Sequence, residues 1–437
     1  MENVVIRVIN RVVHILGDFR PGSLLETSSR AKLLVVSRRK GFHEKFIELI
    51  SVVKDLNESI ETVSISKALV VSEKTPEPGE TVRPYNWPQT PGVYSPEGEV
   101  DLLHAKSGIP HLAVIGSTGV GKTTLVKHIV SDAAKSGFRV VVLDAHGEYG
   151  ELVQKLGGVA GPPRIAICEL SDQELLSLTS LIRVQSPIRM MRYIRYFVDA
   201  FCDLAKRINI GDIYKALHSC TEAMMMLDKL SPNQKMLDEQ DNLKIEFVNS
   251  LINTAGKVTF NALREIVKRD EERVAATMMY LLWAADAAQL QLFNSEMPKI
   301  TAINLFEAKN IFMTSDVALA VISFILRKLI EMREPSVVVV EEAARLTEDE
   351  TAKRVIYLAL AQARKFGVKL VLISQKAAEY VQNTRIVAGR IQNVEYAKQI
   401  AALAPHMPGE IARLLPQLSV GEFVYIDRDV MPIRVIL

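Results

Sequence analysis

A glycine-rich segment of eight residues, Gly116–Thr123, carries the clearest chemical signal in the chain. It reads GSTGVGKT, follows the β-prone run HLAVI and precedes the run LVKHIV, which has helical spacing. Strand, glycine loop and helix in this order are the context that a phosphate-binding loop requires. Glycines let backbone N–H groups approach a phosphate closely, and the helix that follows adds the positive end of its dipole. The segment therefore predicts a nucleotide-binding site.

Individual residues of this loop have separate tasks in binding a nucleotide. Lys122 is placed to reach the β- and γ-phosphates of ATP, and the Thr123 hydroxyl is placed to ligate Mg²⁺. We expect the nucleotide to contact nine consecutive residues: Gly116, Ser117, Thr118, Gly119, Val120, Gly121, Lys122, Thr123 and Thr124. A glycine-rich surface turn is the alternative interpretation, and the flanking strand and helix disfavour it.

A pair of acidic residues, Glu341-Glu342, follows the valine run SVVVV. Consecutive valines are typical of a strand that is buried on both faces in a parallel sheet. Ligands of open α/β sheets bind at the carboxyl ends of such strands. We expect Glu341 to hold the water shell of the metal and Glu342 to polarise the attacking water. The alternative is a buried strand that ends in a solvated acidic turn.

Two further strands end in polar residues. The run KLVLIS ends before Gln375, whose amide we expect to contact the γ-phosphate or the attacking water, although by itself it would more simply be a strand terminus. The run VVVLD ends at Asp144, and His146 and Glu148 follow it. One histidine and two carboxylates make a weak metal site. A polar cluster beside the phosphates is the better interpretation of these three residues.

Secondary-structure patterns divide the chain into four predicted parts. Strands alternate with helical patterns around the residues above, which predicts an α/β core with a parallel sheet. We expect a β-rich, barrel-like domain over 1–74, a Pro- and Gly-rich linker over 75–99, the core over 100–169 and 298–437, and a helical insertion over 170–297. An amphipathic helix is expected near Phe42–Leu56, and a terminal strand pair around Asp427–Asp429.

The composition limits the classes of partner. The formal net charge of +2 over 437 residues is small, so any binding of nucleic acid must depend on local patches. The apolar stretch Ala275–Ala288 is too short to span a bilayer, and no signal-peptide pattern opens the chain. Cys168, Cys202 and Cys220 lack metal-ligand spacing. We therefore expect free thiols, no membrane insertion and a cytoplasmic location.

Four strings together, GSTGVGKTT, LDAHGEY, VVVVEEAARL and ARKFGVKLVLISQ, make the chain resemble the HerA/FtsK superfamily. Within it the chain resembles the HerA-like, hexameric DNA-translocating ATPases, and LDAHGEY is the most specific string. The resemblance covers about 100–165 and 299 to the end of the chain. It implies a RecA-like P-loop ATPase core, ATP and Mg²⁺ as cofactors, and a homohexameric ring on double-stranded DNA. It also implies a NurA-type nuclease partner that docks through the N-terminal domain.

Two positions depart from the family pattern. Glu341 stands where the family has an aspartate, and Ala344 stands where it has a histidine. The longer carboxylate is compatible with Mg²⁺, because this ion keeps several waters and can be held through them. The missing histidine concerns the coupling of hydrolysis to DNA.

Ring ATPases of this kind place an arginine of one subunit in the active site of the next. Arg364 in ARKFG and Arg385 in NTRI are the candidates, with a solvated surface arginine as the alternative.

Basic residues between Arg183 and Lys215 could contact DNA phosphates, although a solvated helix face explains them better. No motif that reads bases is evident, so binding should be non-specific.

The motifs and the resemblance together predict a DNA translocase or helicase that acts in DNA end processing. One alternative is a conjugation, secretion or packaging motor of the same superfamily. Another is a nucleotide-gated scaffold with low turnover.

Overall fold

A computed structural model describes residues 3–42, 62–104, 108–172, 174–175, 295–304, 314–346, 357, 360–361, 363–376 and 379–436. The chain forms two compact units, one of residues 1–142 and 333–437 and the other of residues 143–332. Nearly all of the predicted helical insertion lies outside the described residues, together with its basic stretch. The predicted helix near Phe42–Leu56 lies outside them too, apart from its first residue.

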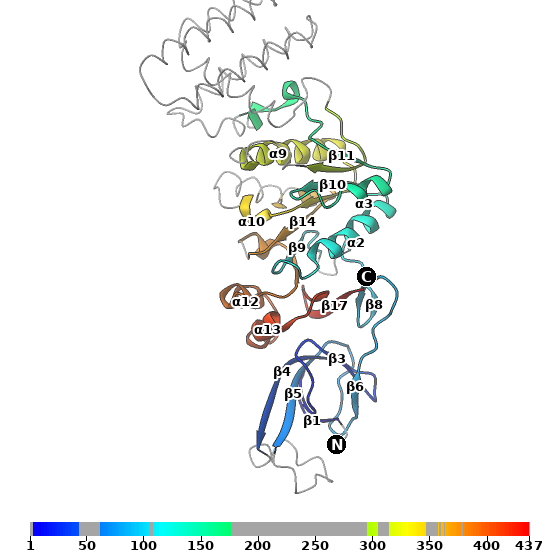
Figure 1. Cartoon of the computed structure of the whole chain (residues 1–437), viewed down its shortest axis with the longest axis vertical. Coiled ribbons are helices and arrows are strands. Elements are labelled where there is room, and N and C mark those ends of the chain that lie inside the picture. The colour runs from blue at the N-terminus through cyan, green and yellow to red at the C-terminus, as the bar shows by residue number, and fades with distance from the viewer. Residues whose placement is uncertain are drawn as a thin grey trace, which may run out of the picture. The chain divides into compact units, whose positions relative to one another are not determined.

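The N-terminal strands of the first unit, drawn in shades of blue in Figure 1, form an antiparallel sheet. Their order in the sheet is β1-β2-β5-β4-β3-β6. Their bounds are β1 Val4–Ile9, β2 Val12–Leu16, β3 Leu24–Thr27, β4 Lys32–Phe42, β5 Thr62–Val70 and β6 Val82–Pro84. A bridge between Val4 and Thr81, with hydrogen bonds from Val5 N to Glu80 O and from Val82 N to Asn3 O, joins the first strand to the last. The sheet therefore closes into a small barrel, whose last strand lies beyond the predicted domain boundary at residue 74.

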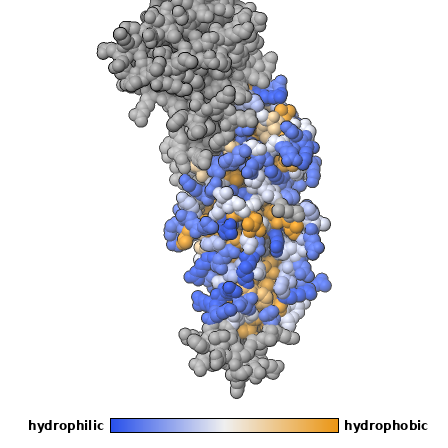
Figure 2. Space-filling model, viewed as in Figure 1, coloured by the Kyte–Doolittle hydropathy of each residue, from blue (hydrophilic) through white to orange (hydrophobic). Residues whose placement is uncertain are grey.

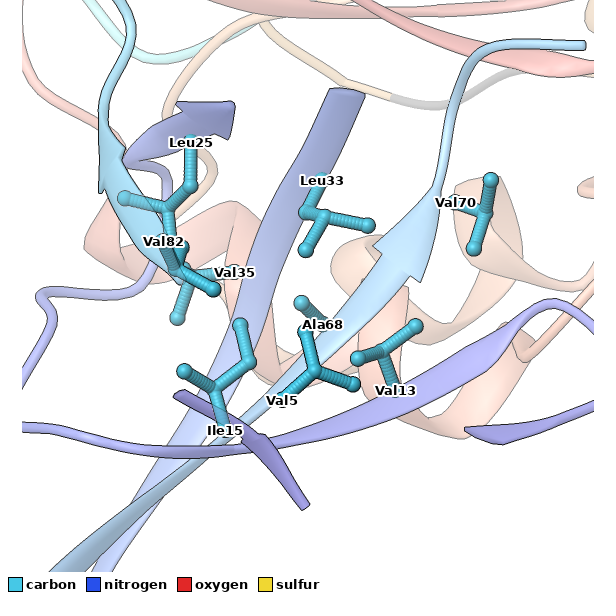
Figure 3. Packing of buried hydrophobic residues seen from close by; sticks show 9 residues of the cluster. All are labelled: Val5, Val13, Ile15, Leu25, Leu33, Val35, Ala68, Val70 and Val82. Atoms are coloured by element: carbon cyan, nitrogen blue, oxygen red, sulfur yellow. The ribbon is translucent and has the colours of Figure 1, made fainter. Parts of the chain in front are cut away.

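Alternate residues of these strands fill the barrel. The side chains that point inward are small or branched and fully or almost fully buried: Val5, Val13, Ile15, Leu25, Leu33, Val35, Ala68, Val70 and Val82 (Figure 3). Successive side chains of a strand face opposite sides, so a spacing of two along β2, β4 and β5 puts these residues on one face. This alternation is what made the strands predictable from the sequence.

The predicted linker is in part structured. It contains β6, which pairs with β3, and also β7 (Gly92–Ser95) and β8 (Gly98–Glu99). Strand β7 pairs with the last strand of the chain, and its Val93 is buried. Pro84 is the last residue of β6, and the other prolines of the segment lie outside the three short strands. The segment predicted as a Pro- and Gly-rich linker over 75–99 thus also contributes three short strands to the sheets of the first unit.

The α/β core of the first unit contains a mixed sheet in the order β10-β13-β14-β9-β15-β16-β17-β7-β8. Its further elements are β9 Leu112–Ile115, α2 Lys122–Lys135, β10 Arg139–Asp144, β13 Ser336–Val340, α10 Ala343–Leu346, η4 Arg364–Phe366, β14 Val368–Ser374, η5 Glu379–Asn383, β15 Arg385–Ala388, α12 Val394–Ala401, α13 Pro408–Leu414, η6 Leu415–Gln417, β16 Glu422–Ile426 and β17 Val430–Ile436. Strands β13, β14, β9 and β15 are parallel neighbours, whereas β15, β16, β17, β7 and β8 pair antiparallel. The predicted α/β class with a RecA-like core is confirmed.

The register of the parallel strands decides where their ends meet. Val340 of β13 pairs with Leu372 of β14, and Ser374 of β14 pairs with Ile115 of β9. All residues of β9 and β13 are buried, which explains their continuous apolar runs. Three strand ends therefore lie next to one another at the carboxyl edge of the sheet, and the residues that follow them are those with predicted chemistry.

The second unit contains two parallel strands and two helices within its described residues. They are α3 Gly150–Lys155, β11 Val159–Gly161, β12 Ile300–Asn304 and α9 Thr314–Met332, with the short 3₁₀ helix η2 Ile167–Glu169. Arg327 of α9 donates a hydrogen bond of 2.9 Å to the buried carboxylate of Glu174. Cys168 is disulfide-bonded. The prediction of free thiols is wrong for this residue, because sequence spacing does not tell which thiols meet in a fold.

In the view of Figure 2, hydrophilic side chains cover most of the described surface and apolar ones form smaller patches. None of the described helices combines the length and the apolar character that crossing a membrane requires.

Candidate nucleotide-binding site

The glycine loop connects the end of β9 to the start of α2. Gly119 and Gly121 have φ values of +76° and +96°, in the left-handed region that glycine adopts without a steric penalty. A Cβ on Gly116 would lie 2.9 Å from a methyl carbon of Val120. The loop therefore requires glycine for its shape, and this shape leaves a backbone cradle at the N-terminus of α2.

Three other segments of the chain hold this loop in place. Gly116 N donates to Ser374 O over 3.3 Å, and Ser117 N donates to Arg390 O over 2.8 Å. Gly421 N donates to Val120 O over 3.0 Å. The positions of Arg390 and Gly421 were not predicted, since their contact with the loop depends on β15 and β16 lying beside β9. The hydrogen bonds fix the loop to the sheet independently of any ligand.

The side chain of Lys122 contacts the backbone of the glycine loop. The Lys122 ammonium donates to the carbonyl oxygens of Gly116 and Ser117 over 2.7 and 3.0 Å. The first N–H groups of a helix have no acceptor within the helix, and the helix dipole adds positive potential there. An ammonium and backbone donors in one cradle fit the phosphates of a nucleotide.

The acidic pair follows β13, and its two residues differ. Glu341 is buried, with 8% of its surface exposed, whereas Glu342 is half-buried. Glu342 has a φ of +51°, a left-handed conformation that costs about 1–2 kcal/mol for a residue with a Cβ. Non-glycine residues in this conformation cluster at functional sites. Within the acidic pair, it is therefore Glu342 that the fold holds in an uncommon backbone conformation.

A chain of hydrogen bonds joins Glu342 to the glycine loop. The Gln375 amide nitrogen donates to a Glu342 carboxylate oxygen over 3.1 Å. The Thr118 hydroxyl donates to the Gln375 amide oxygen, also over 3.1 Å. Tyr380 is fully buried, and this burial, together with the nearby charge of Glu342, raises the pKa of its phenol to about 12. The structure thus brings Gln375, Glu342 and the loop together, and the tyrosine beside them stays neutral.

The two candidate arginines lie in different environments. Arg364 is exposed in η4. Arg385 is 1% exposed within β15, and it donates to the Tyr425 hydroxyl over 3.1 Å and to Pro110 O over 3.2 Å. A guanidinium buried among strands of its own chain does not reach a neighbouring subunit. The prediction for Arg385 is therefore wrong, and Arg364 remains the candidate.

In the second unit, Asp144 organises the segment that carries His146 and Glu148. One carboxylate oxygen of Asp144 accepts from the backbone N–H groups of His146, Gly147 and Glu148 over 3.2, 2.8 and 3.1 Å. Its other oxygen accepts from Tyr149 N over 2.9 Å, and the residue is 2% exposed. Asp144 thus fixes the turn, which leaves His146 and Glu148 exposed. Within the described ranges, no cluster of three or more His, Cys, Asp or Glu side chains fits a metal ion.

The parallel sheet with a glycine loop between β9 and α2 defines a P-loop protein of the α/β class. A family model described as "Helicase HerA, central domain" matches residues 103–329, just over half of the chain. The chain belongs to this family, which confirms the resemblance found in its sequence motifs.

Curated relatives are named as DNA repair helicases. The "DNA double-strand break repair helicase HerA" of Sulfurisphaera tokodaii is 23% identical over 344 residues, which are 73% of this chain and 63% of the relative. The protein of the same name from Saccharolobus solfataricus is 21% identical over 425 residues, 88% of this chain and 79% of the relative. The chain thus spans less than two thirds of the length of the first relative.

Solved structures of two other proteins also align with the chain. VirB4 of Thermoanaerobacter pseudethanolicus aligns with a TM-score of 0.48 and 18% identity, covering 81% of this chain and 97% of VirB4. The bacterial conjugative coupling protein TrwB aligns with a TM-score of 0.46 and 13% identity, covering 76% of this chain and 86% of TrwB.

Proposed function

We propose that this chain hydrolyses ATP with Mg²⁺ and uses the energy to move double-stranded DNA through a homohexameric ring. The observation that carries the proposal is the meeting of three groups at the carboxyl edge of β9, β13 and β14. These groups are the glycine loop with Lys122, the carboxylate of Glu342 and the amide of Gln375. Membership of the HerA family and the names of its curated relatives support DNA as the polymer that is moved.

Each residue of the site has a proposed task in hydrolysis. Lys122 and the loop N–H groups bind the β- and γ-phosphates, while the Thr123 hydroxyl and Glu341 hold Mg²⁺ with its waters. Held there, Mg²⁺ would supply positive charge against the phosphates. Glu342 polarises the attacking water, and Gln375 orients that water or the γ-phosphate. Because little covalent chemistry is left to the protein, positioning and charge stabilisation carry the catalysis.

The proposed partners follow from the same family membership. Duplex DNA would be bound through its phosphates without sequence preference, since no base-reading motif is evident in the chain. A NurA-type nuclease would dock through the N-terminal barrel, which makes DNA end processing the proposed setting. Arg364 would enter the site of the neighbouring subunit.

Substituting the loop lysine tests the proposed activity. Lys122→Ala should lower ATP turnover at least roughly 100-fold with duplex DNA present, because the charge on the β- and γ-phosphates is lost. Lys127→Ala is the matched control, since it removes a lysine from the same helix beyond the loop and should leave turnover unchanged. A Lys122→Ala protein within about twofold of wild type would contradict the proposal. Wild-type turnover that duplex DNA does not change at low salt would favour a nucleotide-gated scaffold.

A further inference from the structure

We propose that Thr118 holds Gln375 in a resting position that a γ-phosphate must release, so that the site distinguishes ATP from ADP before hydrolysis. We call the hydrogen-bonded chain Thr118–Gln375–Glu342 the latch. The inference rests on the proposed ATPase function and assigns Thr118 a positioning role within it.

The direction of the hydrogen bonds in the latch is fixed by chemistry. A carboxylate only accepts hydrogen bonds, so the Gln375 group that faces Glu342 must be the NH₂ group. The amide oxygen then faces Thr118, and the threonine hydroxyl must donate to it. Both ends of the Gln375 amide are therefore engaged in this state, each by a residue of a different segment of the site.

The latch can be released without moving the sheet. Strand β14 ends at Ser374, so Gln375 lies just beyond the parallel ladder, and the side chains of Thr118 and Gln375 are exposed. The backbone below them is fixed by the pairing of Ser374 with Ile115 and by the hydrogen bond from Gly116 N to Ser374 O. Rotation of two exposed side chains is enough to open the chain of hydrogen bonds.

A γ-phosphate and the resting latch compete for the same amide. Phosphate oxygens accept hydrogen bonds, and the Gln375 NH₂ group that could donate to them is turned toward Glu342. To serve a γ-phosphate, Gln375 must turn, and the bond from Thr118 to its oxygen is then lost. ADP has no γ-phosphate and leaves the latch closed. The Thr118 bond therefore opposes the binding of ATP and not the binding of ADP.

The test compares affinities for ADP and for the slowly hydrolysed analogue ATPγS in the full-length protein with Mg²⁺, by calorimetry. Thr118→Val keeps the shape of the side chain and removes its hydroxyl. We expect the ratio of the dissociation constant for ADP to that for ATPγS to rise about three- to tenfold, as for one neutral hydrogen bond. Thr118→Ser keeps the hydroxyl and should keep the wild-type ratio. Ser131→Ala removes a hydroxyl of α2 that donates to Lys127 O, and should also leave the ratio unchanged.

A double-mutant cycle separates the latch from a general effect on the loop. In a Gln375→Ala background, Thr118→Val should change the ratio no further, because its hydrogen-bond partner is gone. A ratio that is unchanged or lower in the Thr118→Val single variant, or one that rises equally in the Gln375→Ala background, would overturn the latch. If wild type binds both nucleotides while the ratio stays constant, only the latch fails. If wild type binds neither, the proposed function fails with it.

Discussion

The two adjacent glutamates at the end of β13 differ in burial, in backbone conformation and in hydrogen bonding. Glu341 is buried, while Glu342 is half-buried, adopts a left-handed backbone and accepts a hydrogen bond from Gln375. A left-handed residue turns its side chain away from the course of the preceding strand. This geometry brings the Glu342 carboxylate to the residues around the glycine loop, which supports the division of tasks proposed for the pair.

Exchanging each carboxylate for an amide should separate these tasks. Glu342→Gln should leave ATP bound and lower its turnover about 100-fold or more, because the amide keeps the shape and loses the base. Glu341→Gln should instead raise the Mg²⁺ concentration needed for half-maximal turnover, because a ligand of the metal shell loses its charge. Nucleotide binding and a Mg²⁺ titration of turnover measure the two effects. The assignment is reversed if Glu341→Gln abolishes turnover with binding intact while Glu342→Gln does not.

Residue type and spacing pointed to the glycine loop, Glu342 and Gln375, because each comes just after a buried, continuously apolar strand. The same reasoning did not separate Arg364 from Arg385, which both stand in short polar strings. Their difference arises only when β15 pairs with β9 on one side and with β16 on the other, which buries Arg385. Burial of a charged residue by distant segments is a property of the fold and leaves no local pattern.

At the scale of elements, a histidine links β9 to β14. His111 precedes β9 and is 2% exposed. Its Nδ1 accepts from Leu370 N over 3.1 Å, and its Nε2–H donates to Leu360 O over 2.9 Å. The neutral ring offers one acceptor and one donor, and both are used. Burial, assisted by the charges of Arg385 and Arg364, lowers the pKa of His111 to about 4.

This lowered pKa predicts a loss of stability at acidic pH. As pH falls from 7 to 5, the unfolded chain takes up a proton on this histidine and the folded chain does not, so the folded state loses about 2 kcal/mol. Chemical unfolding of the first unit at pH 7 and pH 5 measures the change. His111→Gln should be less stable than wild type at pH 7 and should lose less stability at pH 5.

A matched substitution isolates this effect from other titrating groups. His406 is exposed beside α13, and His406→Gln should show the same loss between pH 7 and pH 5 as wild type. Equal losses in the His111→Gln protein and in wild type would contradict the role assigned to His111.

Strands without a continuous apolar run were harder to predict than strands with one. Strands β9, β13 and β14 contain continuous apolar runs, which the sequence shows directly. Strands β6, β7 and β8 have four residues or fewer, and each contains a proline or a glycine. Their pairing is decided by partners far away in the chain, β3 for β6 and β17 for β7. Composition alone therefore pointed to a linker.

At the scale of the whole molecule, the proposed ring requires one chain to complete the site of another. Head-to-tail interfaces place different surfaces of neighbouring subunits against each other. Arg364 suits such a contact, because η4 exposes Arg364 and Lys365 while the adjoining Ala363 and Val368 are buried and anchor the turn. Gly367, with a φ of +73°, ends η4 and leads into β14. The exposed turn is thus held firmly by the strand that also positions Gln375.

Mixing two inactive proteins tests whether Arg364 acts in the neighbouring site. Arg364→Ala should lower turnover about 10³-fold or more while ATP still binds, because a transition-state charge loses its partner. A Lys122→Ala chain keeps Arg364, and an Arg364→Ala chain keeps the loop lysine. In rings assembled from equal amounts, about a quarter of the interfaces then join an intact loop to an intact arginine. ATPase activity should therefore reappear on mixing and follow the proportion of the two chains. Lys365→Ala, which removes the neighbouring cation, should be active by itself. Full activity of Arg364→Ala alone, or no recovery in mixtures shown to exchange subunits, would mean that this arginine does not cross the interface.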